Sequence, residues 1–322
     1  MSLTRFLRSQ LLVSLPPPTH SFANRTVLVT GSNTGLGLEA ARHFTQLGAS
    51  RVLLAVRSLD KGEHARQSIE TSTGIKNVVK VMHLDMSSYA SVLDFAEKLE
   101  KEVPRLDIAV LNAGVNRGIW EVFEDDEATL TVNVVATYLL ACALVPTLRR
   151  TAKQFNTRPT LTFTGSEVHE WAQFPEKNAP DGKIFDALNK KEVKGKPVDL
   201  GNRYQLSKLL QLLCAREFSA LVTDVTVNTV NPGLCYSELS RESGWGMWIL
   251  LKLLARQTEA GSRNLVWAAG MGEESHGTYV SDCKVEAPSA WVRSEEGKRA
   301  GGRVWREVVE KLERAKSGIT KV

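Results

Sequence analysis

Tyr204 and Lys208 carry side chains that could pass a proton, and they lie four residues apart in a run that predicts a helix, RYQLSKLLQLLCAREFSAL. Four residues make about one helical turn, so both side chains project from the same face. A free tyrosine has a pKa of about 10, and a nearby ammonium lowers that pKa because it favours the phenolate. The pair could therefore act as an acid or a base near neutral pH. A half-buried helix face without chemistry also fits the spacing, so a function depends on what the rest of the chain supplies.

A glycine-rich turn near the N-terminus has the sequence context of a phosphate site. Residues 26–30 are a β-branched run that predicts a buried strand, and an amphipathic helix is expected to end near residue 47. Glycines between them let the backbone turn tightly and approach a pyrophosphate, which would rest on the helix N-terminus. The alternative is a tight turn that binds nothing. The expected cofactor-binding residues here are Gly31, Asn33, Thr34, Gly35, Leu36 and Gly37.

The second predicted strand, residues 51–56, ends at Arg57. In dinucleotide-binding folds this strand end lies beside the adenosine ribose, where an acidic residue would bind the 2′-hydroxyl of NAD. A guanidinium suits a 2′-phosphate instead. We therefore expect NADP(H) as the cofactor, the alternative being a solvated arginine.

Strands and helices alternate along most of the chain. Alternation of this kind predicts an α/β fold with a doubly wound parallel sheet, here one Rossmann domain over residues 25–322. Ligands of such sheets bind at the carboxyl ends of the strands, where Gly31, Arg57, Asp85 and Asn112 would converge. The further elements expected are helices at 60–73, 88–101, 128–150, 259–270 and 303–316, and strands at 78–84, 106–111, 160–164, 224–230 and 277–280.

Three segments lie outside this regular pattern. Residues 1–24 predict an amphipathic arm that three prolines end. Residues 167–203 are polar and lysine-rich, and we expect an insertion that lies over the site. Residues 234–256 are unusually apolar and are expected to form a substrate lid, although a helix packed on the core or on a membrane surface would show the same composition.

Composition argues against several other classes of protein. The formal charge is +5, but acidic residues are interleaved with the basic ones, so nucleic-acid binding is not expected. The four cysteines are widely spaced, which favours an intracellular, cytoplasmic protein and gives no metal-ligand pattern. No run is expected to reach the roughly 18 apolar residues of a membrane span, so membrane contact would be peripheral.

Taken together, these motifs resemble the short-chain dehydrogenase/reductase family over about residues 26–279. The long gap between Ser166 and Tyr204 is similar to the retinol-dehydrogenase-like branch. The N-terminal arm and Gly261-Ser262-Arg263 are similar to fungal reductases of that branch, many of which belong to secondary-metabolite pathways. The motifs that carry the resemblance are the glycine turn, Asp85, Asn112-Ala113-Gly114, Asn133, Ser166, Tyr204 with Lys208, and Asn231-Pro232-Gly233.

The resemblance implies a role for each catalytic position. Ser166 would hydrogen-bond the substrate oxygen, Tyr204 would give or take the proton, and Lys208 would lower the tyrosine pKa and hold the nicotinamide ribose. Asn133 would support a proton-relay water. The cofactor would also contact Asp85, Met86, Asn112, Ala113, Gly114, Pro232, Gly233 and Ser237.

Two positions depart from the usual family pattern. Gly165 precedes Ser166 where the family commonly has a second serine. Ser237 is the best stand-in for a threonine that often follows the Pro-Gly pair, but its register is less certain.

A homodimer through the long helices is also implied, although the C-terminal extension could block it.

The function expected from these residues is hydride transfer between NADP(H) and a carbonyl or secondary alcohol. Because the predicted lid would lie over the nicotinamide, its tryptophans and leucines favour a bulky apolar substrate, such as a polyketide or terpenoid ketone, a steroid or a long-chain aldehyde like retinal. Two other classes remain open, a non-catalytic NADP(H)-binding regulator and a protein that docks on a membrane surface.

Overall fold

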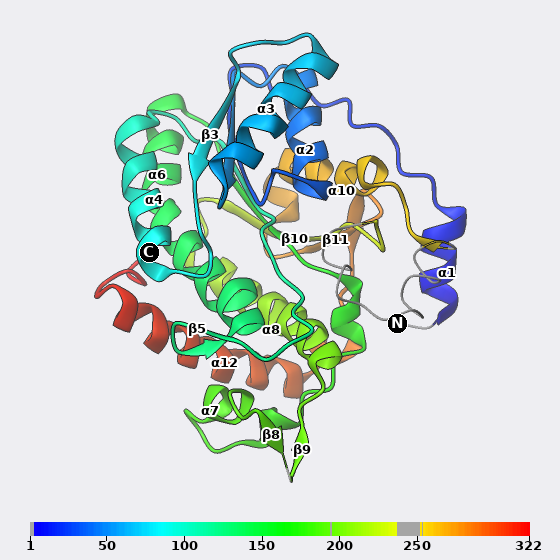
Figure 1. Ribbon diagram of the computed structural model, residues 1–322, viewed down its shortest axis with the longest axis vertical. Coiled ribbons are helices and arrows are strands. Elements are labelled where there is room, and N and C mark those ends of the chain that lie inside the picture. The colour runs from blue at the N-terminus through cyan, green and yellow to red at the C-terminus, as the bar shows by residue number, and fades with distance from the viewer. Residues whose placement is uncertain (1–2, 194, 237–251, 253) are drawn as a thin grey trace.

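The computed structural model describes residues 3–193, 195–236, 252 and 254–322. Its centre is an eight-stranded sheet with the order β12-β11-β10-β7-β4-β1-β2-β3 (Figure 1). All neighbouring strands are parallel except β11 and β12, which are antiparallel. The strands of this sheet are β1 Thr26–Thr30, β2 Arg51–Val56, β3 Val79–His83, β4 Ile108–Leu111, β7 Thr160–Thr164, β10 Thr226–Asn231, β11 Tyr279–Ser281 and β12 Lys284–Glu286.

Helices cover both faces of the sheet because the central strands are apolar on both faces. In β2, Leu53 packs into one apolar layer and Leu54 into the other, as the alternation of side chains along a strand requires. The helices of one layer are α2 Gly35–Gln46, α3 Leu59–Thr73 and α10 Thr258–Gly270. The helices of the other layer are α4 Tyr89–Glu102, α6 Thr137–Phe155, α8 Leu200–Leu221 and α12 Glu295–Ala315. The predicted doubly wound α/β fold is confirmed.

The parallel strands bring several polar segments to one edge of the sheet. Gly31 follows β1, Arg57 follows β2 and Asn112 follows β4, while Ser166 lies just after β7 and Pro232 follows β10. The paired registers keep these strands in step, for example Val29 with Val110 in β1 and β4. The convergence expected from the sequence therefore follows from the topology.

The helix predicted over residues 128–150 is interrupted near its start. A short helix, α5 Ala128–Leu130, leads into a π-helical turn, η1 Thr131–Ala136, and then into α6. π-Helical turns are rare and often occur at functional sites. By length and composition alone, these elements together are long and apolar enough to cross a membrane, but 94% of the most apolar window is buried inside the protein.

Several peripheral elements differ from the sequence-based expectation. The antiparallel strand β12 was not predicted, and α12 begins at Glu295 rather than near residue 303, after Ser294 caps its first turn by accepting a bond from Gly297. The polar insertion contains η2 Glu167–Glu170, η3 Pro175–Asn178, α7 Ile184–Leu188 and the β8 Glu192–Val193 and β9 Lys196–Pro197 hairpin. Ser166 caps the start of its first turn, η2, whereas α7 and the β8–β9 hairpin lie on the side of α12 that faces away from the sheet (Figure 1). The remaining elements are α1 Leu3–Leu12, β5 Val122–Phe123, β6 Asp126–Glu127, η5 Glu273–Ser275 and α11 Ala290–Arg293.

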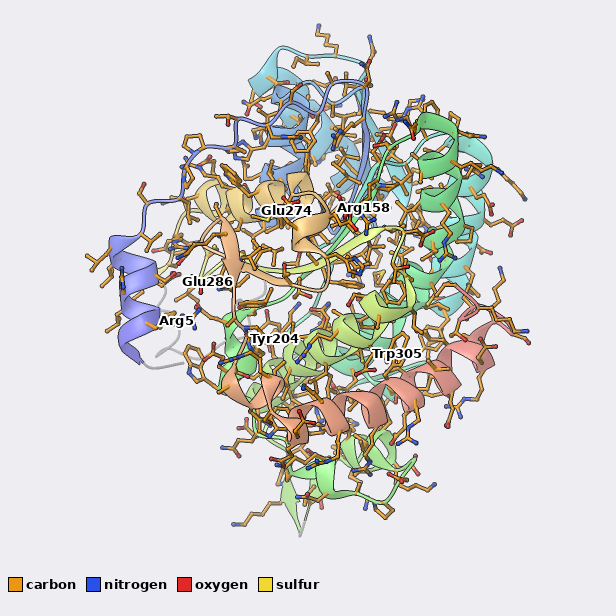
Figure 2. The ribbon with its side chains drawn as sticks, turned by 180° about the vertical axis from the view of Figure 1, so that it is seen from behind. Arg5, Arg158, Tyr204, Glu274, Glu286 and Trp305 are labelled. Carbon is orange, nitrogen blue, oxygen red and sulfur yellow. The ribbon has the colours of Figure 1, made fainter. Side chains whose placement is uncertain are left out.

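The C-terminal helix α12 is part of the core. Trp305 is 8% exposed, and its ring lies 5.5 Å from that of Tyr138 on α6 and 6.1 Å from that of Phe218 on α8 (Figure 2). The buried carboxylate of Glu307 accepts bonds from the backbone nitrogens of Ile184 and Phe185 and so fixes the start of α7. Because α12 covers α6 and α8, it occupies surface through which the predicted homodimer would form.

We expect Trp305→Ala to lower the free energy of unfolding by about 3–5 kcal/mol, because it removes a large buried aromatic side chain and leaves a cavity. Urea unfolding followed by circular dichroism measures the change. Trp171→Ala is the control, since Trp171 is 40% exposed and should lose less. An equal loss in both variants would show that α12 is not anchored by Trp305.

Candidate active site

The glycine turn after β1 is pressed against the segment after β4. Gly31 has φ +64°, and a Cβ on it would lie 2.9 Å from the Cα of Ala113. A Cβ on Gly37 would lie 2.6 Å from Nδ2 of Asn112. Gly35, by contrast, has φ +60° and nothing within 4 Å of its Cβ position. The turn therefore packs against the protein at Gly31 and Gly37, whereas the space beside Gly35 is empty.

The open side of the turn suits a pyrophosphate. Thr34 precedes α2 in an extended conformation, and its side chain caps none of the first N–H groups of the helix. Free N–H groups and the helix dipole favour an anion at that end. The hydroxyl of Thr30 accepts bonds from the backbone nitrogens of Asn112 and Ala113, both at 2.9 Å, which ties β1 to β4 behind the turn. The turn therefore fits the predicted dinucleotide.

The other predicted cofactor residues lie along the same edge. Arg57 is exposed, and no described residue forms an ion pair with its guanidinium. Asp85 is half-buried and accepts bonds from the backbone and hydroxyl of Ser87, while Met86 is buried. Leu36 and Asn33 are half-buried in the turn. All of them follow β1, β2 or β3 at its carboxyl end.

Lys208 is buried at 4% exposure and makes no ion pair with a described residue. Its ammonium donates to the backbone carbonyl of Thr164 at 2.8 Å and lies 5.9 Å from the ring centroid of Tyr204. Burial lowers the pKa of Lys208 to about 8, because the charged form is poorly solvated there. The predicted pair is thus brought together, and with a pKa of about 8 the lysine is still mostly charged at neutral pH.

The pKa of Tyr204 is shifted opposite to the expected direction. Burial raises it to about 12, and the ammonium of Lys208 does not offset this effect. The reason is that removing a phenolate from water costs more than an ammonium 5.9 Å from the ring centroid returns. Tyr204 is therefore protonated at neutral pH, which is the form that can donate a proton.

Asn133 lies in the π-helical turn and is fully buried. Its side chain accepts a bond from the backbone nitrogen of Val115 at 2.8 Å and donates to the hydroxyl of Ser207 at 3.0 Å. A Cβ on Gly114 would lie 3.1 Å from Oδ1 of Asn133 and 3.8 Å from Nζ of Lys208. Gly114 thus marks the point where these two side chains meet.

Ser166 follows β7 and faces the same edge half-buried. Its hydroxyl oxygen accepts a bond from the backbone nitrogen of Val168 at 3.3 Å, which leaves its proton free to be donated. Residue 165 is a glycine where the family commonly has a serine, and the reason is steric. A Cβ at this position would lie 2.7 Å from Cγ2 of Thr229 on β10. A serine would not fit at residue 165 beside this threonine.

The loop after β10 is held by two contacts that the sequence did not reveal. The side-chain oxygen of Asn231 accepts bonds from the backbone nitrogens of Glu167 and Gly233, both at 3.1 Å, so it joins the loops after β7 and β10. Gln10 on the N-terminal helix α1 donates to the carbonyls of Leu234 and Leu254, at 2.9 and 3.0 Å. Asn231 was visible only as part of a motif, and no sequence signal pointed to Gln10.

Some predicted residues lie outside the described part of the chain. Pro232 is buried and Gly233 is half-buried, with φ +80°. Ser237 and most of the predicted lid, including Trp245 and Trp248, lie outside the described residues.

Several known proteins resemble this chain over most of its length. A family model described as short chain dehydrogenase matches residues 25–155. The chain is 49% identical to short chain dehydrogenase/reductase dmxR8 of Cryptosporiopsis sp., over 98% of each chain. The chain belongs to the short-chain dehydrogenase/reductase family. It is also 39% identical to short-chain dehydrogenase anuD of Penicillium roqueforti, over 99% of this chain and 85% of the relative.

Solved structures show the same fold at low sequence identity. The Pseudomonas aeruginosa RhlG/NADP active-site complex aligns with a TM-score of 0.61 at 20% identity, covering 82% of this chain and 96% of that one. In this fold the glycine turn follows β1 and Ser166 lies just after β7, while Lys208 on α8 donates to Thr164, the last residue of β7.

The contact between Gly165 and Thr229 predicts a coupled pair of substitutions. We expect Gly165→Ala to lower the free energy of unfolding by about 1–3 kcal/mol, because the new methyl group overpacks against Cγ2 of Thr229. Thr229→Ser removes that methyl group, so the double variant should be more stable than the sum of the single changes allows. Denaturant unfolding of the four proteins gives the coupling energy, and simple additivity would contradict the proposed clash.

Proposed function

We propose that this protein is an NADP(H)-dependent oxidoreductase that interconverts a carbonyl and a secondary alcohol on a bulky apolar substrate, as a step of secondary metabolism. The observation that carries the proposal is that Asn133 and Lys208 both lie against Gly114, while the Lys208 ammonium lies 5.9 Å from the ring centroid of Tyr204. A proton donor and a dinucleotide-type turn on one edge are what such a reaction needs.

The described residues fit a nicotinamide dinucleotide. The glycine turn and the start of α2 would hold the pyrophosphate, Asp85 and Asn112 to Gly114 would line the adenosine side, and Lys208 would hold the nicotinamide ribose. When bound, the cofactor supplies or accepts the hydride. The guanidinium of Arg57 is exposed and pairs with no described residue, which favours a 2′-phosphate there, and the RhlG neighbour is a complex with NADP.

The chain's own residues would manage the charge and the proton. In the reducing direction, negative charge develops on the substrate oxygen, and the free hydroxyl proton of Ser166 can stabilise it. Tyr204, held protonated by burial, would then deliver the proton to that oxygen. Lys208 places a positive charge near the tyrosine as the phenolate forms.

Substitution of Tyr204 tests the catalytic assignment. We expect Tyr204→Phe to lower kcat for carbonyl reduction by about 10²- to 10⁴-fold while NADPH still binds, because only the proton donor is removed. NADPH consumption across a panel of ketones and aldehydes, with binding followed by NADPH fluorescence, makes the measurement.

The control for this substitution is Tyr89→Phe, which removes a phenol hydroxyl from the first residue of α4, where no described residue is its hydrogen-bond partner. Near wild-type turnover in Tyr204→Phe would contradict the role of Tyr204. Cofactor binding by the wild-type protein without turnover of any substrate would favour the regulator instead.

Substitution of Arg57 tests the choice of cofactor. We expect Arg57→Ala to raise KM for NADPH by about 10- to 100-fold and to leave KM for NADH little changed, because a charge-assisted contact to the 2′-phosphate is lost. Arg66→Ala is the matched control, since it removes a cation from α3 that is paired with Glu63 and Glu70. Equal effects on both cofactors would argue against a 2′-phosphate contact.

A further inference from the structure

Gln211 lies on α8 one turn after Lys208 and is 1% exposed. Its side-chain amide reaches two groups of the candidate site. Nε2 donates to the backbone carbonyl of Asn133 at 3.2 Å, and Oε1 accepts from the ammonium of Lys208 at 3.4 Å. One side chain therefore joins the π-helical turn to the lysine.

The backbone of Gln211 is held by a hydrogen bond as well. Tyr138, which is fully buried on α6, donates its hydroxyl to the backbone carbonyl of Gln211 at 2.5 Å. The shift of hydrogen-bonding register in a π-helical turn leaves carbonyls that other groups must satisfy. Within the described turn, Thr137 donates to the carbonyl of Val132 and Gln211 donates to that of Asn133. The buried amide is thus satisfied at both ends, as burial requires.

We propose that Gln211 is a positioning residue that couples the ammonium of Lys208 directly to the Asn133 carbonyl of the π-helical turn. This inference rests on the proposed function and deepens it, because it assigns part of the lysine's orientation to a residue outside the Tyr204–Lys208 motif.

The hydrogen-bond geometry gives Gln211 a specific effect on Lys208. A lysine ammonium has three protons to donate. Thr164 and Gln211 take two of them, so one proton remains for an acceptor other than these two described residues. Gln211 thereby orients the ammonium with a neutral amide oxygen. A carboxylate in the same place would offset the positive charge of Lys208 and compete for the protons of the ammonium.

The groups around Lys208 are almost all neutral. The carbonyl of Thr164 faces it from β7, Asn133 lies beside it from the π-helical turn, and Gln211 and Tyr204 face it from α8. Among these described groups only Tyr204 titrates. A change at Gln211 should therefore be read out in the titration of Lys208 with little interference.

Two substitutions of similar size should move that titration in opposite directions. Gln211→Met keeps the length of the side chain but removes the acceptor, so the charged form of Lys208 loses a partner and its pKa should fall by about one unit. Gln211→Glu places a carboxylate beside the ammonium, so the pKa should rise by at least a similar amount. The control is Ser219→Ala, which changes a buried hydroxyl on α8 about three turns after Lys208.

The direct measurement is an NMR titration of the full-length protein labelled with ε-¹³C lysine, with the Lys208 signal assigned from a Lys208→Met variant. This readout needs neither cofactor nor turnover, so it can succeed even if the proposed oxidoreductase function fails. Opposite shifts in the two variants support the proposal. An unchanged Lys208 pKa in a folded Gln211→Met or Gln211→Glu protein overturns it.

Kinetics then connect the positioning to the reaction. If the proposed function holds, the pH at which kcat/KM falls on the alkaline side should move down in Gln211→Met and up in Gln211→Glu, while Ser219→Ala keeps the wild-type profile. A purely structural role would lower activity in both Gln211 variants without moving the profile in opposite directions. Thermal unfolding of each variant verifies that folded protein is compared.

Discussion

The burial of the Lys208 ammonium is the constraint on which the candidate site depends. A buried charge is costly unless hydrogen bonds replace its water. Here the Thr164 carbonyl and Gln211 supply them, and burial still lowers the pKa of Lys208 to about 8. The strand β7, the helix α8 and the π-helical turn are therefore joined at Lys208 and Gln211 by these hydrogen bonds.

Close backbone packing at the strand ends gives the site its second fixed part. Gly31 and Gly37 are pressed against Asn112 and Ala113 with no room for a Cβ, so the turn after β1 and the segment after β4 form one unit. On the opposite side, Asn231 joins the loops after β7 and β10. An apolar core on both faces of the sheet supports these polar connections. The cofactor surface and the proton-transfer groups are thus parts of the same framework.

Elements near both ends of the chain complete this framework. Gln10 on α1 bonds the carbonyls of Leu234 and Leu254, and Arg256 pairs with Asp282 at 3.1 Å beneath the same helix. α12 covers α6 and α8 through Trp305. Both helices contact elements that carry candidate site residues or that follow them directly. Their amphipathic sequences indicated helices or arms, but not the surfaces on which they dock.

The sequence by itself determined the features that depend on local spacing. The Tyr204–Lys208 pair shares one helix face, the glycine turn joins a strand to a helix, and strand ends converge because a parallel sheet requires it. Only the tertiary structure decided the contacts between distant residues and the burial that follows from them. Gln211 reaching Asn133, Thr229 excluding a side chain at Gly165, and the raised pKa of Tyr204 all belong to that class. The physical reason is that desolvation and close packing are set by neighbours far apart in the chain, which no local pattern records.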